Sequence, residues 1–172
     1  MKNHEYRTAT SLIHDLIDIV SKNGALLLNV GPRPDGTIPE TEQKLLLEIG
    51  DWLALNGEAI YETRPWKIFG EGPTEILEGA FNDIKRASFT ARDIRFTRKG
   101  KTLYAIVLGW PANGKLSTET LAEGGKHAPE KIRSIELIGN PASLSWKRDR
   151  KRLTIRLPLE RPCRHAYVFK VA

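Results

Sequence analysis

Five carboxylates are the candidates for acid–base chemistry, which needs two carboxyl groups held in different protonation states. They are Asp35, Glu40, Glu42, Glu58 and Glu62. Asp35 stands in an Asp-Gly turn, and Glu40 and Glu42 suit the start of a helix, where negative charge meets the positive end of the helix dipole. Glu58 and Glu62 follow that helix and are expected to be solvated. We therefore predict no catalytic residue in this chain.

His14 and Asp18 are four residues apart, which on a helix is the spacing of two metal ligands. No third ligand accompanies them, so an exposed contact between neighbouring helix turns is the preferred interpretation. The glycine-rich segment 70–73 has no expected strand before it and no Lys-Ser or Lys-Thr after it, which argues against a phosphate loop. We predict neither a metal nor a cofactor.

Cys163 is the single cysteine, so the chain has no internal disulfide, and we expect a half-buried thiol in a strand. Trp66, Trp110 and Trp146 could stack on sugars, but the last two stand in alternating segments and are expected in the core. No apolar run reaches the roughly 18 residues that span a membrane. We expect no membrane partner, and the N-terminus lacks the apolar stretch of a signal peptide.

A helix is predicted to carry His14 and Asp18. Apolar side chains at helical spacing predict it over 11–23, with Thr10 or Ser11 as its N-cap. Gly24 is expected to supply the left-handed residue at its end.

A buried strand and a second helix are predicted next. The apolar run 25–30 predicts a parallel strand buried on both faces, and Asp35-Gly36 predicts a turn. The segment 37–40 then has the pattern of a capping box, and the helix that it opens ends at Asn56-Gly57.

The second half has a different period. From about Ala91, apolar and polar residues alternate in five or more short segments separated by turns, a pattern typical of an antiparallel β-sandwich. The stretch 67–90 is poorly patterned and is interpreted as a connecting loop with room for one edge strand. The fold class is thus an α/β barrel remnant of helix, strand and helix, followed by an antiparallel β-sandwich.

Charge divides the chain at the same place. Residues 1–66 carry 6 Lys and Arg against 10 Asp and Glu, and residues 67–172 carry 21 against 11. Such asymmetry indicates two units, 1–66 and 67–172. The basic half raises nucleic-acid binding, but its Lys and Arg are spread over many strands and are expected on their solvent faces. We therefore expect no nucleic-acid partner.

The predicted strand 25–30 lacks neighbours. A strand buried on both faces needs partners at both edges, since each buried backbone group left unpaired costs roughly 1–3 kcal/mol. Nothing else in residues 1–66 has the pattern of a strand, and the later strands are amphipathic and antiparallel in character. The partners must therefore come from sequence outside this chain, as in an α/β barrel or a doubly wound sheet.

Several segments in order carry a resemblance to a known family. They are IVSKNGALLLNVGP (19–32), DGTIP (35–39), GDWL (50–53), NGEAIY (56–61) and TRPW (63–66). Together they resemble the α-L-fucosidases of glycoside hydrolase family 29, most of which have Asn at the position of Ala25 and Gly at that of Glu62. The match is dense over 10–66 and rests mainly on strand pattern over 92–171.

The resemblance implies a (β/α)8-like catalytic barrel, of which 1–66 is the terminal segment, followed by a β-sandwich domain. It implies hydrolysis of terminal α-L-fucose by a retaining mechanism, with a nucleophile, an acid/base and sugar-gripping residues on barrel segments that this chain lacks. The expected partners are fucosylated glycans, through the missing barrel, and the N-terminal part of the same enzyme. Family members are often periplasmic, secreted or lysosomal.

Three residues are nevertheless candidates for contact with substrate, because active sites of barrels lie at the C-terminal ends of the strands. They are Asn29, Arg33 and Asp35. Alone, the chain is expected to be an inactive C-terminal fragment. The alternative is a β-sandwich that binds carbohydrate or another partner by itself, which an exposed row of aromatic side chains on one sheet face would favour.

Overall fold

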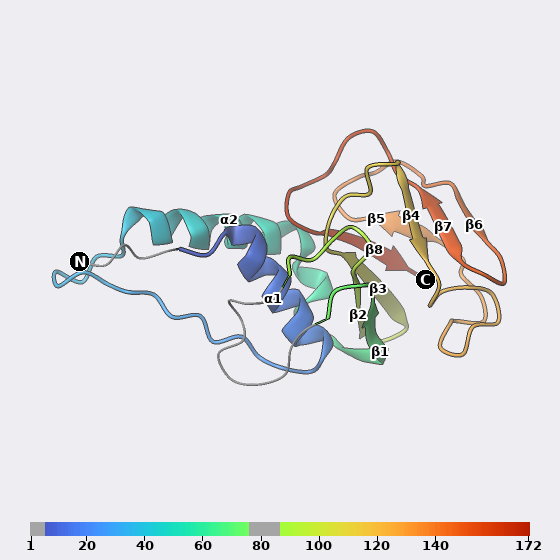
Figure 1. Ribbon diagram of the computed structural model, residues 1–172, viewed down its shortest axis with the longest axis horizontal. Coiled ribbons are helices and arrows are strands. Elements are labelled where there is room, and N and C mark those ends of the chain that lie inside the picture. Colours follow the sequence, from blue (N-terminus) through green and yellow to red (C-terminus); the bar gives the residue numbers. More distant parts are fainter. Residues whose placement is uncertain (1–5, 76–86) are drawn as a thin grey trace.

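A computed structural model describes residues 6–75 and 87–172 of the protein (Figure 1). Two helices come first, α1 (Ala9–Ser21) and α2 (Glu40–Asn56), and the short 3-10 helix η1 (Gly57–Ala59) follows α2. The strands are β1 (Arg64–Glu71), β2 (Ile94–Lys99), β3 (Thr102–Val107), β4 (Lys115–Thr118), β5 (Ile135–Leu137), β6 (Trp146–Arg148), β7 (Leu153–Arg156) and β8 (Tyr167–Val171). The predicted order of helices followed by an antiparallel β-sandwich is confirmed.

The strands form two antiparallel sheets. One has the order β1-β2-β3-β8-β5 and the other the order β4-β7-β6. Their facing sides enclose one core, in which Phe96, Leu116, Ile155 and Phe169 are almost fully buried. Because side chains alternate across a strand, the same sequence that fills this core also presents residues to the opposite face of the larger sheet.

The opposite face of the five-stranded sheet is covered by the helices, so the molecule has three layers (Figure 1). Ile13 and Ile17 of α1 and Trp52 of α2 pack there against Ile106 and Val168 of the sheet. The Trp52 indole N–H donates to the carbonyl of Ala166 at 2.9 Å. The helices of the first half therefore share a core with the strands of the second.

A buried ion pair joins α1 to the same face of the sheet. Arg95 of β2 is 3% exposed, and its Nε lies 2.6 Å from a carboxylate oxygen of Asp18. The other oxygen of Asp18 lies 2.8 Å from Lys22 Nζ. The guanidinium of Arg95 also stacks 4.9 Å from the ring centre of Phe89. The buried charge of Arg95 is thus balanced by the carboxylate of Asp18 between the helices and the larger sheet.

The predicted exposed contact between His14 and Asp18 is wrong. Both side chains are buried, and each has its own partner on another element: the His14 ring bonds the carbonyl of His165 at 2.9 Å, and Asp18 pairs with Arg95. The prediction failed because the sheet covers this flank of α1, which helical periodicity alone does not reveal.

Both ends of α1 differ from the prediction in detail. Thr8 is the N-cap, and its hydroxyl accepts the N–H of Ser11 at 3.1 Å. At the other end the left-handed residue is Asn23, with φ 69°, rather than Gly24, and the N–H of Gly24 still reaches back to the carbonyl of Ile19. Asparagine tolerates this conformation better than most residues do.

The start of α2 also differs. The helix begins at Glu40 with no side-chain cap, so the predicted capping box is wrong. The hydroxyl of Thr37 donates instead to the carboxylate of Asp35, because both residues belong to the turn that precedes the helix. Glu40 and Glu42 do lie in the first turn, and the helix ends at Asn56 before Gly57, as predicted.

The edge strand foreseen within 67–90 exists as β1, which starts earlier, at Arg64. Its pairing with β2 is irregular between Pro65 and Gly70. A Cβ on Gly70 would lie 2.3 Å from the carbonyl oxygen of Ile94, so only glycine permits this close approach. Residues 76–86 of this interval lie outside the described residues.

Cys163 is half-buried, as predicted, but lies in the loop before β8 rather than in a strand. Its thiol donates to the carbonyl of Ala166 at 3.2 Å, and burial raises the pKa of the thiol. Trp110 and Trp146 are half-buried against the sandwich core, although Trp110 lies just beyond β3. Neither described helix is long and apolar enough to cross a membrane.

Candidate functional site

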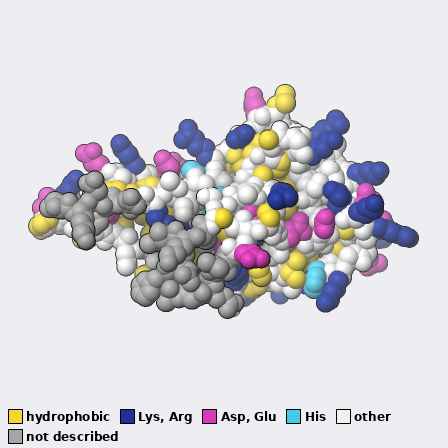
Figure 2. Space-filling view, viewed as in Figure 1, with side chains coloured by type: hydrophobic (Ala, Val, Ile, Leu, Met, Phe, Trp, Pro, Cys, Tyr) yellow, Lys and Arg dark blue, Asp and Glu magenta, His cyan; other side chains and the backbone are white. Residues whose placement is uncertain are grey.

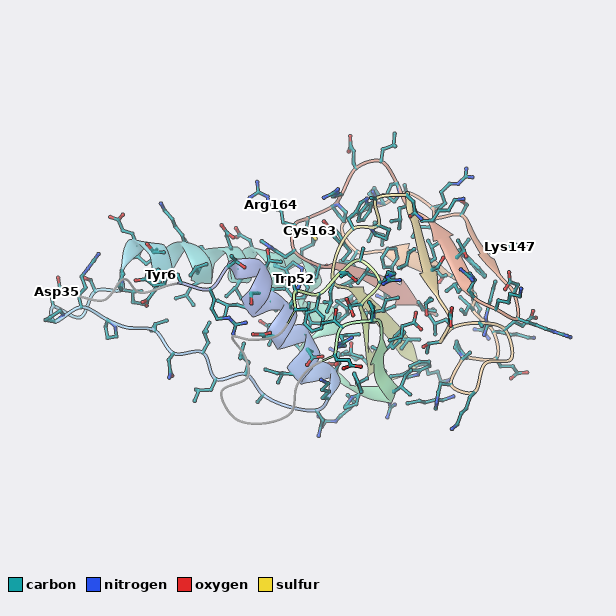
Figure 3. All side chains as sticks on the ribbon, viewed as in Figure 1. Tyr6, Asp35, Trp52, Lys147, Cys163 and Arg164 are labelled. Carbon is teal, nitrogen blue, oxygen red and sulfur yellow. The ribbon has the colours of Figure 1, made fainter. Side chains whose placement is uncertain are left out.

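The three predicted site residues lie on one long excursion, residues 22–39, which we call the arm. It leaves the end of α1, extends away from the sandwich and returns at the start of α2 (Figure 1). Asp35 lies at its far end, opposite the sandwich (Figure 3). The arm has no helix or strand and most of its side chains are exposed.

The predicted strand 25–30 is not formed in this chain. The segment pairs with none of the described strands, and Leu27 is 86% exposed, Leu28 37% and Val30 39%. A strand needs hydrogen-bonding neighbours, and the neighbours that the sequence called for do not lie in the described part of the chain. The apolar pattern was identified correctly, but the strand that it predicts is absent here.

Arg33 and Asp35 are brought together in one tight turn. The carboxylate of Asp35 accepts the N–H of Thr37 at 3.0 Å and its hydroxyl at 2.7 Å, while the N–H of Arg33 donates to the carbonyl of Thr37 at 2.7 Å. The bond from the Thr37 backbone, assisted by the hydroxyl, lowers the pKa of Asp35. Gly36 has φ 86°, which suits the turn. At neutral pH this carboxylate is ionised, and its bonds to Thr37 hold it in the turn.

Asn29 lies elsewhere on the arm. It borders a hollow of about 190 Å³ between the arm and the two helices, whose other walls include Leu28, Leu45 and Ile49. Most of the side chains that line the hollow are apolar. Its charged side chains are Arg7, just before α1, and Glu42 in the first turn of α2. The structure therefore does not bring Asn29 into the turn of Arg33 and Asp35.

Three of the remaining carboxylates on the candidate list, Glu42, Glu58 and Glu62, have structural partners. Glu42 accepts the N–H of Gly31 at 2.9 Å and so ties the arm to α2. Glu58 lies 3.3 Å from Lys170, and Glu62 lies 2.7 Å from Lys99, whose hydrogen bond and charge lower the pKa of Glu62. None of these contacts holds one carboxyl group protonated beside another.

A second polar cluster was not foreseen. The Nδ1 atom of His165 lies 2.8 Å from the hydroxyl of Thr10, and its Nε2 lies 3.8 Å from Glu48. Burial lowers the pKa of His165, so the ring is neutral near pH 7 and accepts from or donates to Thr10 without charge. These residues link the loop before β8 to both helices. Because they stand up to 155 residues apart, no local pattern could have indicated them.

No group of three or more potential metal ligands occurs among residues 6–75 and 87–172. The large exposed aromatic side chains of that part are Tyr6, Tyr61 and Phe69, none of which lies on the three-stranded sheet. An aromatic row on a sheet face, which would favour a stand-alone carbohydrate-binding module, is therefore not present in the described sandwich.

Two family models match the chain. The first describes alpha-L-fucosidase and matches residues 1–58, and the second describes the alpha-L-fucosidase C-terminal domain and matches residues 87–172. Between them they include both helices, the arm and all strands except β1.

Characterised relatives agree with these matches. The tissue alpha-L-fucosidase of Homo sapiens is 35% identical over 150 residues, which are 87% of this chain and 27% of the human protein. The alpha-L-fucosidase of Branchiostoma floridae is 30% identical over 172 residues, covering 97% of this chain and 33% of the relative. The chain thus spans about a quarter to a third of the relatives' length.

Solved structures show the same fold. The Thermotoga maritima alpha-fucosidase in complex with fucose is 31% identical, with a TM-score of 0.75 over 99% of this chain and 36% of that protein. An alpha-L-fucosidase of family GH29 from Bacteroides thetaiotaomicron shares the fold at 19% identity, with a TM-score of 0.69. Because both family models and these relatives match in chain order, this chain belongs to the α-L-fucosidase family, glycoside hydrolase family 29, and represents its C-terminal part.

Proposed function

We propose that this chain contributes the closing segment of a catalytic barrel and the C-terminal β-sandwich to an enzyme that removes terminal α-L-fucose from glycans with retention of configuration. Alone it is inactive. In this proposal residues 1–66 belong to the barrel and 67–172 to the sandwich, although β1 of the larger sheet already begins at Arg64 and the two parts share the core between the helices and that sheet.

The exposed apolar arm is the observation that carries this proposal. Leu27 is 86% exposed, and Leu47 on the nearby part of α2 is 67% exposed. Both lie within the stretch that matches the alpha-L-fucosidase family model. An exposed leucine in a buried-strand pattern, beside an exposed leucine on a neighbouring helix, supports a surface that other strands and helices would cover.

The carboxylates support inactivity of the isolated chain. A retaining mechanism needs two carboxyl groups about 5–5.5 Å apart, one of them kept protonated. The candidate carboxylates are instead engaged one by one: Asp35 with Thr37, Glu58 with Lys170 and Glu62 with Lys99. A hydrogen bond or ion pair of this kind keeps a carboxylate charged, which is the opposite of what a general acid requires.

Activity of the purified chain is the first test. It should release no aryl alcohol from an aryl α-L-fucoside at any pH between 4 and 8. Turnover that persists through purification and disappears on substitution of one of the chain's own carboxylates would contradict the proposal.

Complementation is the sharper test. The barrel part of the Thermotoga maritima enzyme, expressed without the third that this chain matches, should gain fucosidase activity when this chain is added. The variant Leu27→Asp should prevent this gain, because a charge would then enter the strand position that the barrel covers. Leu159→Asp is the matched control, since Leu159 is fully exposed in the loop before β8.

Three outcomes of complementation decide the matter. Activity with the parent chain and the control, but not with Leu27→Asp, supports the proposal. Equal activity with all three would show that the arm does not enter the barrel. If the parent chain binds the barrel part and the complex stays inactive, the proposed function is wrong.

The substrate-contact role of Asn29, Arg33 and Asp35 belongs to the same proposal. In a completed barrel, residues at the end of the strand position 25–30, such as Asn29, and those just after it, such as Arg33 and Asp35, approach the rim of the active site. In the complemented enzyme, Arg33→Ala should raise KM for the fucoside with little change in kcat, because it removes binding rather than chemistry. An unchanged KM would place the turn away from the substrate.

A further inference from the structure

The outer face of the three-stranded sheet is unusually basic. Its inward residues, such as Leu116, Leu153 and Ile155, fill the sandwich core, so the alternate residues point to solvent. Those outward residues, together with the one preceding β7, form what we call the cationic face: Lys115, Ser117, Lys147, Arg152, Thr154 and Arg156. The hydroxyls of Ser117 and Thr154 lie 3.4 Å apart, which confirms that they share one side.

The hairpin of β6 and β7 concentrates charge. Residues 146–156 contain six Lys and Arg and one acid, Asp149, which gives a charge of +5 out of the protein's +6. Lysines and arginines gather at this end of the molecule in the space-filling view, and Lys147 lies at the end farthest from Asp35 (Figures 2 and 3). The basic half is therefore not evenly basic.

Among residues 6–75 and 87–172, the cations of this face have no carboxylate partner in an ion pair. No carboxylate of the described residues lies within 4.0 Å of the charged atoms of Lys115, Lys147, Arg152 or Arg156. Lys115 and Arg156 even stand directly opposite each other on β4 and β7. Like charges in such a position repel, which is a cost to the sheet that a bound anion would relieve.

Two charged residues next to the cationic face, Arg148 and Asp149, form hydrogen bonds that hold the backbone. Arg148 points inward, and its guanidinium donates to four backbone carbonyls, those of Leu121, Ala122, Pro129 and Glu130, to hold the loop 119–130. Asp149 accepts the N–H groups of Lys151 and Arg152, which lowers its pKa and fixes the hairpin turn. Within the described chain, the side chains of the four exposed cations of the face donate no hydrogen bond, although the charges of Lys147 and Arg152 also help to lower the pKa of Asp149.

We propose that the cationic face binds a sulfated polysaccharide. Strands lie about 4.8 Å apart and alternate residues about 7 Å apart, so the face presents cations as a flat array at spacings that suit repeated anionic groups along a chain. Lys and Arg supply charge-assisted hydrogen bonds to sulfate oxygens, and Ser117 and Thr154 supply neutral donors between them. The choice of a glycan rests on the proposed function, because a fucosidase acts on sugar chains.

The form of the face favours a glycan over nucleic acid. Single-stranded nucleic acid is held by stacking on exposed aromatic rings, and duplex DNA is read by a helix or ribbon that enters a groove. Trp146, the aromatic residue of this sheet, is half-buried against the core and does not offer its ring to a base. The face lies on the side of the sandwich away from the helices and the arm, so it stays free when a barrel is added (Figure 1).

The test compares two charge-matched variants of the full chain. The face variant replaces two Lys and two Arg by Gln: Lys115→Gln, Lys147→Gln, Arg152→Gln and Arg156→Gln. The control variant makes the same change elsewhere on exposed positions: Lys44→Gln, Arg64→Gln, Arg98→Gln and Lys101→Gln. The control includes Arg64 and Arg98, which also stand opposite each other on neighbouring strands. Thermal unfolding of both variants checks that each is folded.

Binding is measured with immobilised heparin, with dextran sulfate and uncharged dextran, and with duplex DNA, at about 150 mM NaCl. The parent chain should bind heparin and dextran sulfate but not dextran, and the face variant should bind them at least about tenfold more weakly than the control variant does. Equal losses in the two variants would show that net charge alone is responsible and would overturn the proposal. Tighter binding to DNA than to heparin would overturn the choice of partner. Neither result would bear on fucosidase complementation, which does not involve this face.

Discussion

The sandwich with its docked helices and the arm both contain continuous apolar runs, but those of the sandwich are buried and that of the arm is exposed. Ile106 in β3 and Val168 in β8 are fully buried, and strands on both sides pair with each of these segments. Leu27 and Val30, in an equally apolar run, remain exposed and are paired with none of the described strands. The two segments differ in whether the described part of the chain supplies hydrogen-bonding partners for them.

The boundary between the two regions runs through helix α2. Trp52, near its end, is 2% exposed and bonded to Ala166, whereas Leu47, on the part beside the arm, is 67% exposed. Residues 1–66 are therefore neither uniformly buried nor uniformly exposed. Helix α1 and the last turns of α2 belong to the packed body, and the arm with the first turns of α2 does not.

Hydrogen exchange should give the largest effect. The amides of residues 26–29 have no backbone hydrogen bond within the described chain and should exchange at nearly the rate of an unfolded peptide. Those of β3 and β8, paired on both sides, should be slower by about a thousandfold or more, because they open only with the whole domain. Amides of α1 near Ile13 and Ile17 should resemble the strands. Slow exchange at 26–29 in a monomer would remove the distinction on which the proposed function rests.

The ion pair between α1 and the sheet gives the next largest effect. Replacing Asp18 by Asn leaves Arg95 buried without a counter-charge, and the free energy of unfolding should fall by about 3 kcal/mol. Urea unfolding measures it. Glu62→Gln, which breaks the exposed pair with Lys99, is the control and should have little effect. If both variants behave alike, α1 is not held to the sheet as the structure indicates.

These examples also show how far the sequence could be interpreted. Periodicity located α1, α2 and the alternating strands, because each pattern is local and its partners are close or regular. It could not show that Arg95 lies over Asp18, since the two are 77 residues apart and each is ordinary in its own segment. It predicted a strand at 25–30 because a continuous apolar run is typical of a buried strand, whereas pairing depends on neighbouring strands, and none of the described strands lies beside this segment.

At the candidate site, too, local features could be predicted from the sequence and long-range relations could not. The turn chemistry of Asp35 was predicted from Asp-Gly and is confirmed by its bonds to Thr37. Its relation to a substrate depends on a rim of strands from elsewhere and stays a proposal. The link of His165 to Thr10 and Glu48 escaped notice because a lone histidine in a loop carries no periodic signal.

Asp93 offers a smaller, pH-dependent test inside the packed body. Burial opposes the charge of this carboxylate, but hydrogen bonds from the N–H and hydroxyl groups of Thr90 and Thr74 outweigh that effect and lower its pKa below the ordinary value of 3.8. A lowered pKa means that the unfolded chain binds the proton more readily. The stabilisation is therefore complete above pH 3.8 and is lost as the pH falls through the lower pKa of the folded state.

The variant Asp93→Asn should lower the free energy of unfolding by about 1–2 kcal/mol at neutral pH, since it loses charge-assisted hydrogen bonds. The difference from the parent chain should be constant between pH 5 and 7 and should shrink below about pH 4. Urea titrations at several pH values measure it. A difference that grows toward acid pH would mean that the sign of the pKa shift is wrong.

The smallest change in the free energy of unfolding is expected for a substitution on the exposed side of α2. This substitution tests whether the part of α2 beside the arm is covered in solution. Leu47→Ala should change the free energy of unfolding by less than about 0.5 kcal/mol, because a side chain that is 67% exposed loses few contacts. Trp52→Phe on the same helix should cost about 1–2 kcal/mol, because it removes the buried bond to Ala166. If Leu47 contributes little to stability while the other end of the same helix is firmly packed, its side chain is available for contact with a partner. If Leu47→Ala instead costs as much as Trp52→Phe, this part of α2 is already covered in solution, and self-association of the chain would then be measured by sedimentation.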